Sequence, residues 1–178
     1  TERIVVGDGD GTTGTDSTTL CCDGSTAGGI TSTGLLAVNG TVNVDFSATP
    51  TSTGTYVVLN HGGGTAATAA NFALANSSSY RGGGSFNVTA TQVTVDLNQL
   101  DLTWNGTTAT WEIGGADTDW NATDQFFTGD SVTFDDTPAT PQTIAMTGLL
   151  APKAVNLANT SLVAYTFSGT AGNGISGT

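Results

Sequence analysis

Threonine and glycine are the residues that most limit what this chain can fold into. The 178 residues include 35 Thr and 25 Gly, whereas charged residues make up only 10%. Branching at Cβ favours threonine in strands and disfavours it in helix interiors. Glycine is costly inside either element and belongs in turns. The composition therefore excludes a long-helix or coiled-coil protein and favours an all-β fold with many turns.

The charge of the chain excludes two classes of partner. Fifteen acidic residues stand against only Arg3, Arg81 and Lys153, which gives a net charge of −12. Binding to nucleic acid needs a basic face that three separated cations cannot build. No stretch approaches the ~20 apolar residues of a membrane-spanning helix. We therefore expect neither nucleic-acid binding nor membrane insertion.

The start of the chain and its composition suggest a secreted protein. The first residue is Thr1 rather than Met, and no positively charged segment followed by an apolar one comes after it. We expect a mature or excised product that lies outside the cell or on its surface. The scarcity of lysine, together with abundant Thr, Asn, Ser and Gly, agrees with this expectation.

The chain divides into an N-terminal arm and a strand-rich core. Residues 1–34 contain one apolar strand candidate, Arg3-Ile4-Val5-Val6, and otherwise too few apolar residues for a core of their own. Residues 35–102 and 103–178 together form the predicted core. In both parts apolar and polar residues alternate, as in Thr41–Phe46 and Ser131–Phe134, which is typical of half-buried strands. A change of parity predicts a bulge or turn near residues 90–92, and Ala-rich residues 65–75 predict a short helix.

One group of motifs lies in the C-terminal part of the chain. These motifs are Trp104-Asn105-Gly106, Trp111, Asp119-Trp120, the run Gly129-Asp130-Ser131-Val132-Thr133-Phe134-Asp135-Asp136, Leu150-Ala151-Pro152 and Tyr165-Thr166-Phe167-Ser168-Gly169. Over about residues 100–178 the sequence resembles the autotransporter-associated β-strand repeat, also called the passenger-associated transport repeat. Members of that family are secreted or cell-surface bacterial proteins with β-solenoid passengers and structural or adhesive roles.

The resemblance and the composition together predict a fold and a function. We expect a short parallel β-helix, or a related β-stack or sandwich, with an extended N-terminal arm. A short stack leaves unpaired strand edges at its ends, and another copy of the same chain is a ready partner for them. The strand Arg3, Ile4, Val5 and Val6 is the candidate for addition to a neighbour's sheet. This predicts a homopolymeric filament or surface layer, and an adhesin or carbohydrate-binding fragment is the alternative.

The two cysteines are adjacent, at Cys21 and Cys22. Neighbouring Cα atoms are about 3.8 Å apart, closer than most disulfides allow. Three states therefore stay open: a strained vicinal ring, disulfides between subunits, and free thiols. Since His61 is the only histidine, a zinc site is not expected.

The sequence also contains candidates for a Ca²⁺ site and for a carbohydrate-stacking site. Asp8, Asp10 and Asp16 lie in a Gly- and Thr-rich loop that offers oxygen ligands for Ca²⁺, although the loop lacks the EF-hand pattern and a solvated turn explains it as well. Trp111 and Trp120 are candidates for stacking on a sugar ring, against the alternative that they pack in the core. No catalytic constellation is apparent, because His61 lies in a glycine-rich turn. We expect no enzymatic activity and no cofactor other than Ca²⁺.

Overall fold

The computed structural model describes residues 3–6, 17–22, 30–46, 54–63, 66–106, 109–116, 118–160 and 162–176. These residues form an all-β fold of several small sheets, none of them closed, and the described part of the chain has no helix of seven or more residues. Three single-turn 3-10 helices, η1 (Ala69–Asn71), η2 (Ser77–Ser79) and η3 (Arg81–Gly83), interrupt the strands. The all-β prediction is confirmed.

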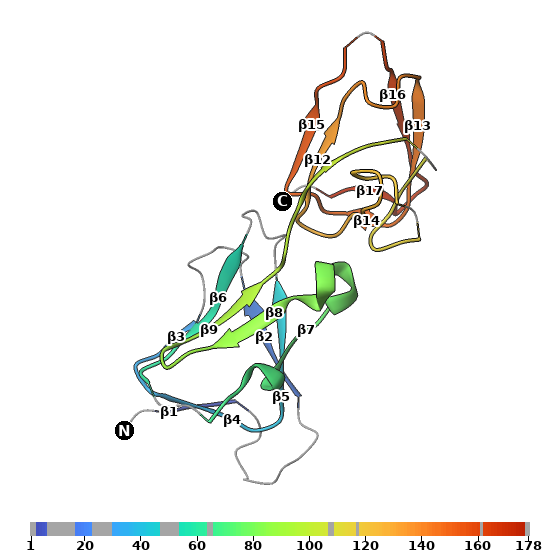
Figure 1. Cartoon of the computed structure of the whole chain (residues 1–178). Helices are drawn as coiled ribbons and strands as arrows, with labels where there is room; N and C mark the ends of the chain where they lie inside the picture. Colours follow the sequence, from blue (N-terminus) through green and yellow to red (C-terminus); the bar gives the residue numbers. More distant parts are fainter. Residues whose placement is uncertain are drawn as a thin grey trace. The chain divides into compact units, whose positions relative to one another are not determined.

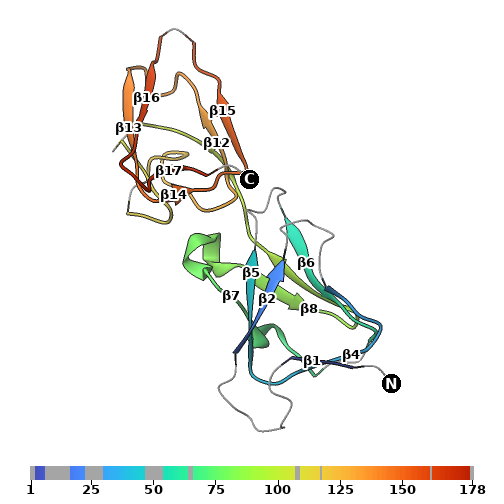
Figure 2. The same cartoon turned by 180° about the vertical axis from the view of Figure 1, so that it is seen from behind.

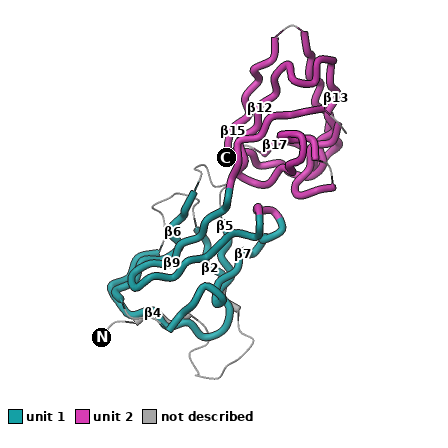
Figure 3. Tube along the Cα trace, viewed as in Figure 1, with its two compact units in different colours: residues 1–78, 82–98 teal, residues 79–81, 99–178 magenta. Residues whose placement is uncertain are grey.

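The chain separates into two compact units (Figure 3). Unit 1 contains residues 1–78 and 82–98, and unit 2 contains residues 79–81 and 99–178. The two units divide after residue 98, within the stretch 35–178 that is predicted to form one core. The short segment 79–81 belongs to unit 2, although the residues on either side of it belong to unit 1.

Unit 1 is built mainly from parallel strand pairs. Its strands are β1 (Arg3–Val6), β2 (Ser17–Cys22), β3 (Ile30–Thr31), β4 (Leu35–Val38), β5 (Thr41–Phe46), β6 (Thr55–Asn60), β7 (Phe72–Leu74), β8 (Ser85–Val88) and β9 (Gln92–Asp96). The described strands form the sheets β1-β4, β2-β5-β7 and β3-β6-β9-β8. Figure 2 shows β2 beside β5. The first three strands therefore each pair with a strand from the next part of the chain.

The strands of the predicted N-terminal arm pair with the strands that follow it. Arg3–Val6 pairs in parallel with Leu35–Val38, and Ser17–Cys22 pairs in parallel with Thr41–Phe46. Residues 1–34 supply too little apolar surface for a core of their own, and the alternating strands that follow provide the missing partner. The N-terminal strands thus belong to the sheets of unit 1.

The end of unit 1 is antiparallel. Strand β9 pairs antiparallel with both β6 and β8. The β8–β9 turn is closed by a bond from the Thr89 N–H to the Gln92 carbonyl, so the predicted turn near residues 90–92 is confirmed. The predicted helix over residues 65–75 is reduced to the single turn η1, followed directly by strand β7. Phe72 and Leu74 alternate with Ala73 and are buried, a strand pattern that overrides the helix propensity of the alanines.

Unit 2 contains only parallel pairs among its named strands. These are β10 (Asp101–Thr103), β11 (Thr110–Trp111), β12 (Ser131–Phe134), β13 (Gln142–Met146), β14 (Leu149–Leu150), β15 (Ala154–Leu157), β16 (Tyr165–Ser168) and β17 (Gly174–Ile175). The described strands form the sheets β10-β12-β15, β11-β13-β16 and β14-β17. Figure 1 shows β12 beside β15 and β13 beside β16. Ser131 pairs with Ala154 and Gln142 with Tyr165, so two sheets share one offset of 23 residues.

Aromatic side chains fill the interior of unit 2. Trp111 is fully buried and its ring centroid lies 5.4 Å from that of Phe126 and 5.5 Å from that of Phe134. Trp120 packs edge-on against Trp104 at 5.1 Å. Edge-to-face contacts at these distances are the favoured geometry for aromatic pairs. These rings pack with buried aliphatic residues such as Val132 and Ile144 in the hydrophobic core of unit 2.

Candidate assembly surface

The last three strands lie at the edges of their sheets. Strands β15, β16 and β17 each have a strand neighbour on one side only within the described part of the chain. An edge strand presents a row of N–H and C=O groups that another chain can pair with. We call these three strands the terminal edge. All three sheets of unit 2 end at it, so the unpaired groups lie on consecutive segments of the chain.

The register of the terminal edge places apolar side chains directly over the core. In a parallel pair, residues in register point to the same face. Four apolar residues of the terminal edge are paired with buried apolar residues of the preceding strands: Val155 with Val132, Leu157 with Phe134, Phe167 with Ile144, and Ile175 with Leu150. The terminal edge therefore repeats the inward pattern of the strands below it.

These apolar residues are much more exposed than their partners. Val132 and Phe134 are at most 1% exposed, whereas Val155 is 41% and Leu157 is 60% exposed. Ile175 is 46% exposed above a Leu150 that is fully buried. Apolar residues take the inward positions both in the terminal edge and in the strands that pair with it. The two sets differ only in how exposed these residues are. Within the described residues, the core of unit 2 is thus open at this end, and its exposed apolar side chains form what we call the end face.

The end of the chain that carries this face lacks acidic residues. Residues 137–178 contain no Asp or Glu and have one charged side chain, Lys153, which is exposed. By contrast, residues 1–34 contain five acids and one arginine. Within this part of the sequence, no carboxylate side chain opposes the approach of a second acidic chain.

The candidate assembly strand at the N-terminus also lies at an edge. Strand β1, which contains Arg3, Ile4, Val5 and Val6, pairs with β4 on one side, and the described sheet contains no further strand. Strands β2 and β3 are likewise the first strands of their sheets. The predicted assembly residues therefore have one edge occupied within their own chain and the other edge unoccupied by any described strand.

The two cysteines differ in exposure. Cys21 is exposed, whereas Cys22 is 5% exposed. Both lie within β2, where successive side chains point to opposite faces of the sheet. A vicinal disulfide would require the two sulfurs to meet on one side, which an extended strand does not permit. The strand geometry therefore disfavours the vicinal ring and leaves Cys21 accessible for contacts with another molecule.

A buried ion pair holds segment 79–81 within unit 2. The Arg81 Nη2 donates to the Asp130 Oδ2 at 2.7 Å and to the Gln125 carbonyl at 2.7 Å, and the guanidinium lies 4.8 Å from the centre of the Phe127 ring. Asp130 is fully buried, and its carboxylate also accepts from the N–H groups of Leu100 and Phe127. Sequence reasoning missed this pair, because the two residues are far apart in the chain and no motif links them.

Burial governs the ionisation of Asp130. Removal from water raises the pKa of this carboxyl, while the two N–H donors and the Arg81 charge act in the opposite direction. The arrangement satisfies a buried charge on several sides and offers no accessible reacting group. We therefore regard the pair as structural.

Asp135 and Asp136, at the end of the motif run that starts at Gly129, cap turns. The Asp135 Oδ1 accepts from the Thr137 N–H at 2.9 Å, and both carboxylate oxygens of Asp136 accept from the Thr160 N–H at 3.1 Å. Short polar side chains commonly stabilise turns in this way. The Tyr165 hydroxyl donates to the Asp135 carbonyl, and burial, with the nearby Asp135 and Asp136 charges, raises the pKa of Tyr165 to about 12.

The structure corrects the carbohydrate-stacking prediction. Trp111 is fully buried and Trp120 is 2% exposed, and both contact other rings of the core. A sugar needs an open aromatic face, which neither residue provides. The prediction that Trp111 and Trp120 bind carbohydrate by stacking is therefore wrong, and their packing in the core explains them.

The calcium prediction falls outside the described part of the chain. Asp8, Asp10 and Asp16 all lie in residues 7–16, which the structure does not describe. Among the residues that it does describe, no three His, Cys, Asp or Glu side chains gather closely enough to hold a metal ion. His61 is 4% exposed, and within the described ranges neither of its ring nitrogens has a hydrogen-bond partner.

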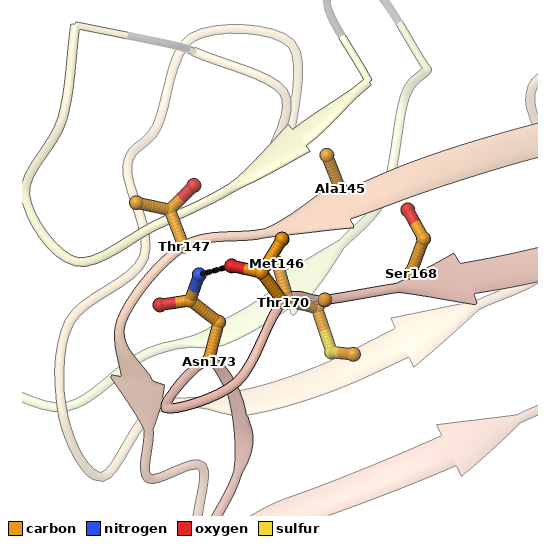
Figure 4. Close-up of a pocket in the computed structure, with 7 residues that line it drawn as sticks. Ala145, Met146, Thr147, Ser168, Thr170 and Asn173 are labelled. Atoms are coloured by element: carbon orange, nitrogen blue, oxygen red, sulfur yellow. Dashed lines mark hydrogen bonds between the residues drawn. The ribbon is translucent and has the colours of Figure 1, made fainter.

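A small pocket lies beside the terminal edge (Figure 4). It has a volume of about 360 Å³ and is lined by the end of β13, the end of β16 and the turn before β17. The Asn173 side chain spans the turn, donating to the Thr170 hydroxyl at 2.7 Å and accepting from the Gly148 N–H at 2.8 Å. These contacts satisfy the amide within the turn. The pocket therefore presents methyl, hydroxyl and thioether groups and carries no charged side chain.

Within the described ranges, no helix is both long enough and apolar enough to cross a membrane. Comparison of the chain with family models, with curated proteins and with solved structures finds no match. The resemblance to the autotransporter-associated repeat therefore stays a prediction that rests on the motifs quoted for it.

Proposed function

We propose that this chain is a structural subunit of an extracellular filament or surface layer, which assembles with other copies by addition of strands. The observation that carries the proposal is the end face. Val155, Leu157 and Ile175 point where a further layer of strands would cover them, at the place where three sheets also end. A surface of this kind favours association, because it offers apolar area and unpaired backbone groups together.

We further propose that the strands of unit 2 coil as a short parallel β-helix. Three consecutive strands, β12, β13 and β14, are followed by β15, β16 and β17, which pair with them in the same order and in parallel. The common offset of 23 residues in two of the sheets supports a repeating coil of about that length. Stacks of this type need covered ends, which connects the proposed fold with the proposed assembly.

A structural role accounts for the chain better than either alternative. The adhesin or carbohydrate-binding reading loses its two stacking residues, since Trp111 and Trp120 are buried. For catalysis, His61 is buried and makes no hydrogen bond to a described nucleophile, and the buried Arg81–Asp130 pair already satisfies its carboxylate. The resemblance to secreted surface proteins favours the extracellular location, as does the scarcity of lysine.

The proposal is tested by removing apolar area from the end face. Leu157→Asn changes a residue that is 60% exposed on the end face, and Leu149→Asn changes one that is 63% exposed on β14, which points away from the core. Burying a leucine is worth about 1.5–3 kcal/mol, so we expect Leu157→Asn to weaken association by roughly tenfold or more. Leu149→Asn is expected to leave association unchanged.

The measurement is sedimentation velocity over a range of protein concentrations, with electron microscopy of the unmodified chain. Circular dichroism establishes that both variants keep the strand signal. A chain that stays monomeric at high concentration would exclude the assembly, and equal loss of association in both variants would show that the end face has no special part in it.

A further inference from the structure

We infer the polarity of this assembly: the terminal edge of one copy receives the first three strands of a second copy, β15 against β1, β16 against β2, and β17 against β3. This inference rests on the proposed function and specifies its partner surface. It differs from a symmetric contact between two end faces, in which both copies would contribute the same strands.

The lengths and the order of the first three and the last three strands support this pairing. Strands β1, β2 and β3 contain 4, 6 and 2 residues, and strands β15, β16 and β17 contain 4, 4 and 2 residues. In both sets a medium strand is followed by one of at least equal length and then by a two-residue strand. Each end therefore offers ladders of matching length in the same chain order.

Strand direction also distinguishes the two ways of joining copies. Strands β1, β2 and β3 pair in parallel with β4, β5 and β6, and the terminal edge pairs in parallel with β12, β13 and β14. Joining a first edge to a terminal edge continues this parallel pattern across the junction. Joining two terminal edges by a twofold axis would instead create antiparallel pairs between strands that are parallel within each chain.

The charge of the sequence favours the same arrangement over a junction of two N-terminal regions. Residues 1–34 contain Glu2, Asp8, Asp10, Asp16 and Asp23 against Arg3, whereas residues 137–178 contain only Lys153. A junction between these two regions joins an acid-rich part of one sequence to a part of another that has no acidic residue. A junction of two first regions would join two acid-rich parts. Electrostatic complementarity of this kind favours one orientation over the others and speeds correct encounter.

The alternation within β2 and β16 predicts which side chains meet. On β2, Cys22 is buried and its neighbour Cys21 is exposed. On β16, Phe167 packs on the core, and Thr166 and Ser168 are exposed. Placing inward residues over inward residues sets Cys21 beside either Thr166 or Ser168 of the other copy. Adjacent strands lie about 4.8 Å apart, which is within the reach of a disulfide.

The test uses the natural thiol of Cys21 as a reporter. Thr166→Cys and Ser168→Cys each add a thiol on β16, and Asn156→Cys adds one on β15, an exposed position on the same terminal edge but in a different sheet. After oxidation we expect one of the two β16 variants to form a ladder of cross-linked species on non-reducing gels. The Asn156 variant is expected to form none, and adding Cys21→Ser is expected to remove the ladder.

The results separate this inference from the proposed function. If the unmodified chain assembles in sedimentation but its copies cross-link through Cys21 to Cys21, or the Asn156 variant cross-links as well as the β16 variants, the polarity is wrong and assembly stands. Assembly with no cross-link in either β16 variant also overturns the pairing. If the unmodified chain does not assemble at all, both the proposed function and the proposed polarity are wrong. Peptide mass spectrometry of the ladder identifies the joined thiols.

Discussion

Arg81 and Asp130 form a short ion pair, 2.7 Å from Nη2 to Oδ2, in which the carboxylate is fully buried and the guanidinium side chain is 20% exposed. The pair ties segment 79–81 to the Gly129-Asp130 turn, and a bond from the Thr128 N–H to the Ser79 carbonyl supports the same connection. A charge buried in this way is costly once its partner is removed.

Arg81→Ala is therefore expected to destabilise unit 2 by about 3–5 kcal/mol, because Asp130 would keep a buried charge without its cation. Arg81→Lys is expected to cost less, since it keeps the charge but loses the flat contact with Phe127. Urea unfolding followed by tryptophan fluorescence measures the effect, since all three tryptophans lie in unit 2. A loss below about 1 kcal/mol would mean that the pair is screened like a surface pair.

Gly129 provides a second test of the same turn. Its φ of +87° is rarely adopted by other residues, and a Cβ at this position would collide with the Gln99 side-chain amide. Gly129→Ala should destabilise unit 2 by more than Gly148→Ala, where φ is +79° and a Cβ meets nothing within 4 Å. Adding Gln99→Ala to Gly129→Ala should recover part of the loss. No recovery would show that backbone strain alone sets the cost.

The hydroxyl of Tyr165 should lose its proton at a higher pH than an ordinary tyrosine. Its pKa is raised to about 12, so the folded chain holds this proton more tightly than the unfolded chain, whose tyrosines titrate near pH ~10. The corresponding stability is complete below pH ~10 and is lost as the pH rises toward 12. The ultraviolet absorbance of tyrosinate, compared between the unmodified chain and Tyr165→Phe, measures the transition. A difference spectrum centred near pH ~10 would contradict the burial of this hydroxyl.

Trp111 should contribute to the stability of unit 2 and not to carbohydrate binding. Trp111→Ala removes a fully buried ring that contacts four others and should cost about 3–5 kcal/mol. Trp111→Phe should cost less, because it keeps an aromatic ring and removes an indole N–H that has no hydrogen-bond partner. Titration of the unmodified chain with oligosaccharides should leave its tryptophan fluorescence unchanged, and quenching would reopen the carbohydrate alternative.

The strands were largely predictable, because their signal is local. Val132 and Phe134 alternate with Ser131 and Thr133, and this period is enough to place a half-buried strand wherever the sheet lies. The turn near residues 90–92 followed from a change of parity for the same reason. The prediction of a helix in the alanine-rich segment was largely wrong. Burial of Phe72 and Leu74 in a sheet stabilises the segment more than the helix propensity of the alanines does.

The site was less predictable, because it depends on which strand covers which. Leu157 and Phe134 occupy the same inward position in successive strands, yet nothing in the sequence tells that one is exposed and the other buried. Trp111 and Trp120 carried two interpretations for the same reason, since a ring that stacks on a sugar and a ring that fills a core have the same local sequence. The Arg81–Asp130 pair spans 49 positions and leaves no periodic signal.

The sequence by itself determined that this protein is all-β, acidic and built from small alternating side chains, because strand preference and charge are properties of residues and their immediate neighbours. Only the tertiary structure decided which strands pair, which tryptophans are enclosed and which end of the core lies open. These depend on contacts between distant segments, and their energies arise from burial that exists only once the segments have met.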